Sequence, residues 1–181
     1  MNTYSLYIDG AAQEDRISKG VHLFIYRASK IPPHVGLLVN GFLYDITSVG
    51  PTIDLSVKDF FKTAQKRKTE VLFIQLKLPP VDNIRDLVSS IVKKHVKVTP
   101  TKSCLVPVKE FISNAYGVDV SRAKFIFELL PLIHHYDLVD EILELNLSKK
   151  IKNSVFEMSK YTDKEVENCI AALTRKSKFS C

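Results

Sequence analysis

The stretch "PPHVGLLVNGFLYDITSVG", residues 32–50, decides how the first half of the chain folds. Within it, two apolar runs at residues 35–39 and 42–47 flank the dipeptide Asn40-Gly41. Asparagine and glycine both tolerate the positive φ that a type I′ turn requires, so this pattern predicts a tight β-hairpin.

The register of this hairpin places polar side chains on one face. With a two-residue loop, Gly36 faces Asp45 and His34 faces Thr47, and directly opposed residues point to the same side of a sheet. Asp45 is then the diagonal neighbour of His34 and Thr47 its direct neighbour, so either residue is a candidate to orient the imidazole. Gly36 leaves room for a side chain or a substrate to approach.

Composition and length indicate a globular protein with one substantial core. The chain has 181 residues, of which 45% are hydrophobic and 25% charged, and it contains no linker-like tract and no internal repeat. The N-terminal segment "MNTYSLYIDG" is not typical of a signal peptide, and no apolar run reaches the roughly 18 residues of a transmembrane helix. We therefore expect a cytoplasmic protein.

The three cysteines, Cys104, Cys169 and Cys181, are widely spaced and show no metal-binding pattern. They predict free thiols in a reducing compartment. Phosphate-loop motifs are also absent from the sequence. We expect neither a metal nor a cofactor.

The formal net charge of +6 favours acidic partners such as nucleic acid or an anionic membrane. The basic residues are scattered over four segments, which we interpret as solvated helix ends or termini: residues 62–68, 93–97, 149–152 and 175–178.

Hydrophobic periodicity and turn residues predict strands first and helices later. Expected strands cover residues 4–8, 21–28, 35–39, 42–47 and 70–78, and expected helices cover a segment capped by Ser56, residues 81–95, a segment ending at Gly117, a segment from Ser121 to Leu130, residues 137–147 and 151–160, and a last segment that begins with the capping box Thr162…Glu165. The predicted fold is α+β, with an antiparallel sheet and packed helices over residues 1–120. A helical C-terminal extension over residues 121–181 packs on this core.

A cysteine heads the helix that ends at Gly117. With Ser103 as N-cap, Cys104 occupies the first helical position, where the positive end of the helix dipole and the free N–H groups favour a thiolate. The same N–H groups are candidates to stabilise an oxyanion. A thiol nucleophile also needs a nearby base, and His34 is the candidate.

Four features follow one another along residues 20–117: a histidine that opens a strand ("HVGLLV"), its paired strand ("FLYDITS"), a later strand and helix, and a cysteine that heads a helix ("SCLVPVKEFISNAYGV"). This order resembles the circularly permuted papain-like fold, in which the histidine precedes the cysteine. Members include permuted NlpC-like amidases, relatives of lecithin:retinol acyltransferase, and the PPPDE isopeptidases. Acyltransferase members carry a second histidine where this chain has Ile46, so the resemblance is nearest to the PPPDE type. It implies Cys104, His34 and Asp45 as catalytic residues.

Two other candidates have structural interpretations. The adjacent pair His134-His135 suits a helix end better than a metal site, because neighbouring helical residues point about 100° apart. Cys169 lies on a predicted apolar helix face and is expected in the core.

The leading functional hypothesis is therefore a papain-like thiol hydrolase that cleaves an amide or isopeptide bond in a peptide or protein conjugate. The alternative is a non-enzymatic basic protein that binds nucleic acid, an anionic membrane or a protein partner.

Overall fold

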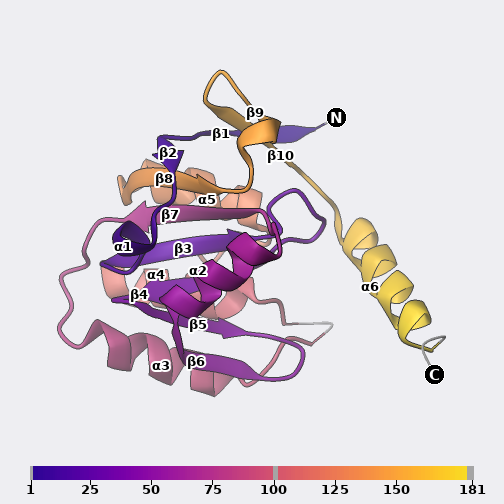
Figure 1. Ribbon diagram of the computed structural model, residues 1–181. Helices are drawn as coiled ribbons and strands as arrows, with labels where there is room; N and C mark the ends of the chain where they lie inside the picture. The colour runs from indigo at the N-terminus through magenta and orange to yellow at the C-terminus, as the bar shows by residue number, and fades with distance from the viewer. Residues whose placement is uncertain (1, 100–101, 179–181) are drawn as a thin grey trace.

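The structure is a computed structural model that describes residues 2–99 and 102–178, leaving aside the side chains of residues 170 and 172–178. Two β-sheets form its framework (Figure 1). The larger sheet has seven strands in the order β2-β8-β7-β3-β4-β5-β6, and the smaller has three in the order β1-β10-β9. With six α-helices around these sheets, the described chain is a mixed α+β protein, as predicted.

Neighbouring strands are antiparallel except for β2 and β8, which are parallel. The strands of the larger sheet are β2 (Gly10–Ala11), β8 (Val139–Leu145), β7 (Val71–Leu76), β3 (Val21–Tyr26), β4 (His34–Val39), β5 (Phe42–Ile46) and β6 (Pro51–Ser56). Those of the smaller sheet are β1 (Thr3–Tyr7), β10 (Val155–Ser159) and β9 (Ile151–Lys152).

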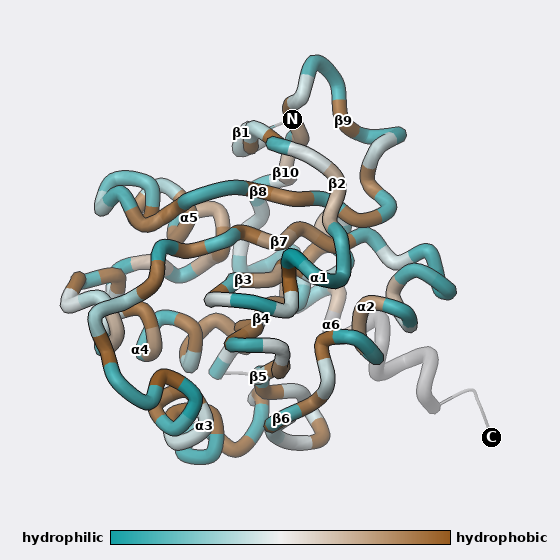
Figure 2. The backbone as a smooth tube through the Cα atoms, turned by 60° about the vertical axis from the view of Figure 1, so that its left-hand side comes forward, coloured by the Kyte–Doolittle hydropathy of each residue, from teal (hydrophilic) through white to brown (hydrophobic). Residues whose placement is uncertain are grey.

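Helices cover both faces of the larger sheet. One face carries α1 (Glu14–Ile17) and α2 (Val57–Lys66), which lie in front of the sheet in Figure 1. The other face packs against α3 (Ile84–His95), α4 (Leu105–Tyr116) and α5 (Ile126–His135). The central strands are therefore buried on both sides, and hydrophobic residues gather toward the middle of the molecule in Figure 2.

The predicted hairpin is confirmed. Asn40 and Gly41 have φ values of 47° and 86°, as a type I′ turn requires, and Val39 pairs with Phe42. Because side chains alternate along a strand, His34 and Asp45 point to the face that carries α2, while Val35 and the other odd-numbered residues of β4 point to the opposite face.

Local signals also place several helix ends correctly. Ser56 caps α2 by accepting a hydrogen bond from the Asp59 amide at 3.4 Å. Gly117 ends α4 in the left-handed conformation. The predicted capping box opens α6 (Asp163–Lys178), where Glu165 accepts from the Thr162 amide at 2.8 Å. In Figure 1, α6 extends away from the two sheets.

The helix expected to run from Ser121 to Leu130 begins later and ends later, as α5. Glu128 accepts hydrogen bonds from the amides of Lys124 and Phe125, at 2.7 and 3.2 Å. These bonds satisfy free N–H groups at the first turn, so the helix begins at Ile126 rather than after Ser121.

The helices predicted over residues 137–147 and 151–160 are wrong, so residues 121–178 hold the strands β8, β9 and β10 as well as the helices α5 and α6. The first segment contains β8, which pairs with β7 and β2 in the larger sheet. Its leucines and glutamates favour a helix locally, but pairing with strands far earlier in the chain overrides that preference. The second segment follows the short 3-10 helix η1 (Ser148–Lys150) and folds into the β9–β10 hairpin.

Candidate active site

His34 is the first residue of β4, and its imidazole lies on the face of the sheet that carries α2. The side chain is 29% exposed, so the ring is half-buried and still reachable from solvent. The ring of Phe24, on the neighbouring strand β3, lies 6.0 Å away between centroids. The packing of this buried phenylalanine limits where the imidazole can turn.

Asp45 is the partner that orients His34. Oδ2 of Asp45 lies 2.6 Å from Nε2 of His34, a distance typical of a charge-assisted hydrogen bond. Thr47, the other candidate, caps its own turn instead, since its hydroxyl donates to the carbonyl of Gly50 at 2.9 Å and accepts from nearby amides. The diagonal contact that the hairpin register predicts is therefore present.

Gly36 makes the contact between His34 and Asp45 possible, but it does not leave open space for a substrate as predicted. A Cβ at this position would lie 2.6 Å from the Phe24 ring and 2.7 Å from Cβ of Asp45. The space beside Gly36 is thus filled by these two side chains and does not admit a substrate. Glycine allows Asp45 to approach β4 closely enough to bond His34.

Cys104 lies at the beginning of α4, half-buried and with a free thiol. It is the N-cap residue itself, one position earlier than expected, and Oγ of Ser103 accepts a hydrogen bond from the Leu105 amide at 3.3 Å. The Val106 amide donates to the carbonyl of Ser103 at 3.2 Å, and Pro107 has no N–H. The row of free amides expected at this helix start is therefore largely occupied.

The structure brings Cys104 and His34 together across the end of the sheet. Cys104 lies close enough to the imidazole to raise the pKa of His34, so His34 has the Asp45 carboxylate as a hydrogen-bond partner and the sulfur as a second neighbour. Because Nε2 is occupied by Asp45, Nδ1 is the ring nitrogen that remains for the sulfur. All three residues that the sequence predicts for the site are thus adjacent.

The electrostatics of this triplet favour a protonated imidazole. Burial opposes the charge on His34, but the hydrogen bonds to Asp45 and Cys104, together with their charges, raise the pKa of His34 to about 10. The second oxygen of Asp45, Oδ1, is buried with no hydrogen-bond partner among the described residues. His34 is therefore the main compensation for this carboxylate, which is a further reason to hold the proton on the ring.

The structure contains an aromatic cluster that the sequence did not indicate. The rings of Phe125, Phe127 and Tyr161 lie 5.0–5.2 Å apart between centroids. Burial, with the nearby charges of Cys104 and Glu128, raises the pKa of Tyr161, so its hydroxyl stays neutral. This cluster joins the beginning of α5 to the segment before α6, within the electrostatic reach of Cys104.

The remaining sequence candidates lie elsewhere. Cys169 is half-buried on α6 and is not in the core, because that helix extends away from the sheets, so this prediction is wrong. Cys181 falls outside the described residues. His134 and His135 occupy the exposed last turn of α5, as predicted, and no cluster of three or more metal-ligating side chains occurs in the described part of the chain.

The basic segments do not converge on one element. Residues 62–68 include the end of α2, residues 93–97 include the end of α3, and residues 149–152 span the end of η1 and β9. The side chains of residues 175–178 are outside the described part. Lys94 pairs with Glu110 at 2.8 Å and Lys150 with Glu70 at 2.6 Å. Part of the positive charge is therefore neutralised within the protein.

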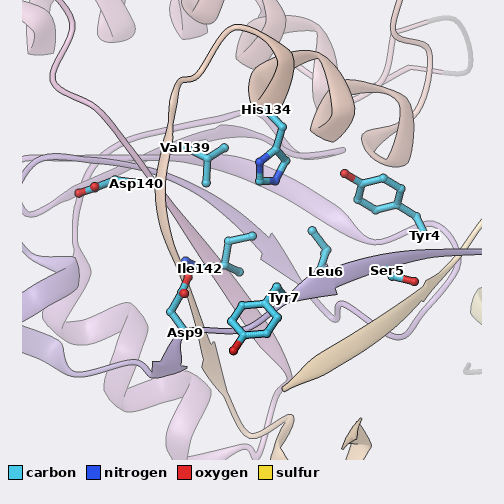
Figure 3. A pocket seen from close by; sticks show the side chains of 9 residues that line it. All are labelled: Tyr4, Ser5, Leu6, Tyr7, Asp9, His134, Val139, Asp140 and Ile142. Atoms are coloured by element: carbon cyan, nitrogen blue, oxygen red, sulfur yellow. Dashed lines mark hydrogen bonds between the residues drawn. The ribbon is translucent and has the colours of Figure 1, made fainter. Parts of the chain in front are cut away.

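Two cavities differ in their position relative to His34, Asp45 and Cys104. The larger, of about 440 Å³, lies between β1, β8 and the end of α5, and Figure 3 shows His134 and Tyr4 pointing into it. None of the three candidate residues lines it. The smaller, of about 180 Å³, is bordered by His34 and Asp45.

Residues of α2 and β6 also line the smaller cavity, and the sequence analysis did not predict that they belong to the site. One available signal was the pair Phe60-Phe61 on a helix, since adjacent helical residues cannot both face the same core. Phe61 is buried, and Phe60 is only partly buried at the cavity.

No family model, curated protein or solved structure matches the chain. Among the described residues, no helix has the length and apolar character needed to span a membrane.

Proposed function

We propose that the protein is a cysteine hydrolase that cleaves an amide or isopeptide bond in a peptide or protein conjugate. Cys104 is the nucleophile, His34 the general base and acid, and Asp45 the residue that orients His34. The single observation that carries this proposal is the position of His34, which hydrogen bonds to Asp45 and interacts electrostatically with Cys104, the N-cap residue of a 12-residue helix. A thiol, a base and an orienting carboxylate are the three parts of an activated nucleophile.

The proposed reaction begins with the proton on His34 and the sulfur of Cys104 as thiolate. The sulfur attacks the substrate carbonyl carbon, a C–S bond forms, and the N–H of Cys104 stabilises the oxyanion. The C–N bond then breaks as His34 donates its proton to the leaving nitrogen. Water, deprotonated by His34, attacks the thioester, the C–S bond breaks, and the acid product leaves.

The permuted papain-like assignment is part of the same proposal. Support comes from the order of the parts: a histidine that opens β4, a carboxylate on the paired strand β5, and a cysteine that begins α4. A reducing compartment suits this activity, because an oxidised Cys104 cannot act as a nucleophile.

Alkylation by iodoacetamide tests the proposal. At pH 6 an ordinary thiol, with a pKa near 8.5, is almost wholly protonated and reacts slowly. We expect Cys104 to react faster than Cys169 at this pH, and the His34→Ala substitution to remove the difference. Mass spectrometry of peptides separates the two sites, so Cys169 is an internal control for reagent and pH.

The opposite outcome would favour the non-enzymatic function. If Cys104 reacts no faster than Cys169 and the His34→Ala variant behaves like the parent, the thiol is not activated. A binding protein would then be the better description, and a salt titration with an oligonucleotide would test its basic segments.

A further inference from the structure

We propose that the cavity beside His34 binds an apolar side chain on the leaving amine of the substrate, so that the enzyme selects amides of hydrophobic residues on that side. This inference rests on the proposed function and adds the substrate class to it. Three features carry the inference: the lining of the cavity, its volume and its position relative to Cys104.

The exposed surface of the lining is mostly apolar, although threonines also border the cavity. Phe24, Leu43 and Ala64 are at most 2% exposed and form its buried part. Leu55, by contrast, is 42% exposed at the cavity and is one of the few large apolar side chains that the described surface leaves open. An apolar wall that continues outward into an exposed leucine is suited to an apolar group arriving from solvent.

Aromatic rings hold this wall in place. Phe60 of α2 lies 5.3 Å from Phe24 and 5.8 Å from Tyr26 between ring centroids. Such aromatic pairs are each favourable by about 1 kcal/mol beyond the area they bury, so the cavity is preformed. Apart from His34 and Asp45, no residue that lines it carries a charge.

The volume limits what can enter. A cavity of about 180 Å³ corresponds to roughly six water molecules at about 30 Å³ each. Sites for whole small molecules usually exceed about 300 Å³. The cavity therefore suits one aliphatic or aromatic side chain rather than a complete ligand or a long chain.

Its position indicates the leaving-group side. His34 and Asp45 border the cavity, and Cys104 does not. The acyl part of the substrate stays on the sulfur, whereas the leaving nitrogen must approach His34 to receive its proton. A group that extends past His34 toward Asp45 thus belongs to the amine, not to the acyl part.

Aminolysis of an acetyl-enzyme measures this selectivity directly. p-Nitrophenyl acetate transfers its acetyl group to Cys104 with release of p-nitrophenolate. An amine then attacks the thioester carbon, the C–N bond forms as the C–S bond breaks, and His34 takes the proton that the nitrogen loses. Because this step is the reverse of amide cleavage, the amine occupies the leaving-group site.

We expect leucinamide to remove the acetyl group from Cys104 at least about tenfold faster than glycinamide at equal concentration, as intact-protein mass spectrometry would record. The Thr63→Trp substitution, at the exposed rim of the cavity, should reduce this ratio to below about threefold by occupying it. Lys62→Trp is the matched control on the same helix, because Lys62 is exposed and does not line the cavity, and it should keep the ratio.

The outcomes separate the two proposals. Suppose that the acetyl-enzyme forms in the parent and fails to form in His34→Ala, but leucinamide and glycinamide then react at equal rates. This result would overturn the inference and leave the proposed function standing. A preference that survives Thr63→Trp would also overturn it. No acetyl-enzyme on Cys104 would refute the proposed function, and the inference with it.

Discussion

The protein carries two histidine–carboxylate pairs of nearly the same geometry. Nε2 of His34 lies 2.6 Å from Asp45, and Nε2 of His95 lies 2.5 Å from Glu110. The first pair joins two neighbouring strands, β4 and β5. The second joins the last turn of α3 to α4, on the opposite face of the sheet. By distance alone, neither pair is the better candidate for chemistry.

Their surroundings distinguish them. His34 has a second partner in Cys104 and a cavity beside it, whereas Nδ1 of His95 is buried without a hydrogen-bond partner among the described residues. Glu110 also shares its charge with Lys94. A histidine–carboxylate pair therefore becomes a candidate site only where a third reactive group and space for a ligand meet it.

The largest expected difference between the pairs concerns activity. His34→Ala should lower kcat/KM for hydrolysis of p-nitrophenyl acetate by about 10² to 10⁴, the usual contribution of a general acid–base residue. His95→Ala should change it by less than about threefold in protein that circular dichroism shows to be folded. Release of p-nitrophenolate is the measurement, and a comparable loss in both variants would remove the distinction drawn above.

The second prediction concerns stability against pH. The pKa of His34 is raised to about 10 in the folded protein, compared with about 6.5 in an unfolded chain. The stability from its charge is thus fully present below about pH 6.5 and is lost as the pH rises toward 10. The gap in free energy of unfolding between the parent and His34→Gln should shrink by roughly 4 kcal/mol over this range. Urea denaturation at several pH values tests this.

His22 supplies the control of opposite sign. Burial, with a smaller effect of the Arg16 charge, lowers the pKa of His22 to about 4. Its contribution is present above about pH 6.5 and is lost as the pH falls through 4, by roughly 3 kcal/mol. His22→Leu should remove this loss in free energy of unfolding between about pH 6.5 and 4. The loss that His34 causes between about pH 6.5 and 10 should stay unchanged. If His22→Leu instead removes the loss of stability between about pH 6.5 and 10, His34 is not the source of that loss.

The third prediction tests why Asp45 lies so close to His34. Gly36→Ala forces a methyl group against the Phe24 ring and Asp45, so it should reduce stability by about 1–3 kcal/mol. Gly50→Ala is the matched control, because nothing lies within 4 Å of its added Cβ, and it should stay within about 0.5 kcal/mol. Equal effects would show that the close approach at Gly36 is not required.

The smallest effect is a titration shift. Asp45→Asn keeps the shape of the carboxylate but removes its charge, so the pKa of His34 should fall by at least about one unit. Glu110→Gln should leave the His34 titration unchanged, since Glu110 bonds His95 and Lys94 instead. NMR of the imidazole carbon-bound protons measures both. A His34 titration that ignores Asp45→Asn would assign the raised pKa to Cys104 alone.

Two hairpins show where sequence reasoning succeeded and where it failed. Asn40-Gly41 signals its turn through glycine, and the prediction is confirmed. The turn at Asn153-Ser154 has positive φ at both residues, at 50° and 61°, but no glycine announces it. The sequence pattern of residues 151–160 therefore predicts a helix, whereas in the structure Val155 pairs with Lys152 as in any two-residue hairpin.

The site divides in the same way. The diagonal contact of His34 with Asp45 follows from hairpin register, because both residues lie within a few positions of one turn. The proximity of His34 to Cys104 was predicted from the family resemblance rather than from local sequence patterns. The cavity formed with α2 and β6 was not predicted. Hydrophobic periodicity does not predict which segments far apart in the sequence will contact one another.

By itself, the sequence determined the turns, caps and amphipathic faces, because these depend on residues a few positions apart and on backbone preferences that act locally. Only the tertiary structure decided that β8 is a strand, that Cys104 reaches the imidazole, and that an apolar hollow opens beside it. Those outcomes depend on packing between segments far apart in the chain, where burial and strand pairing outweigh the fraction of a kcal/mol that local propensity contributes per residue.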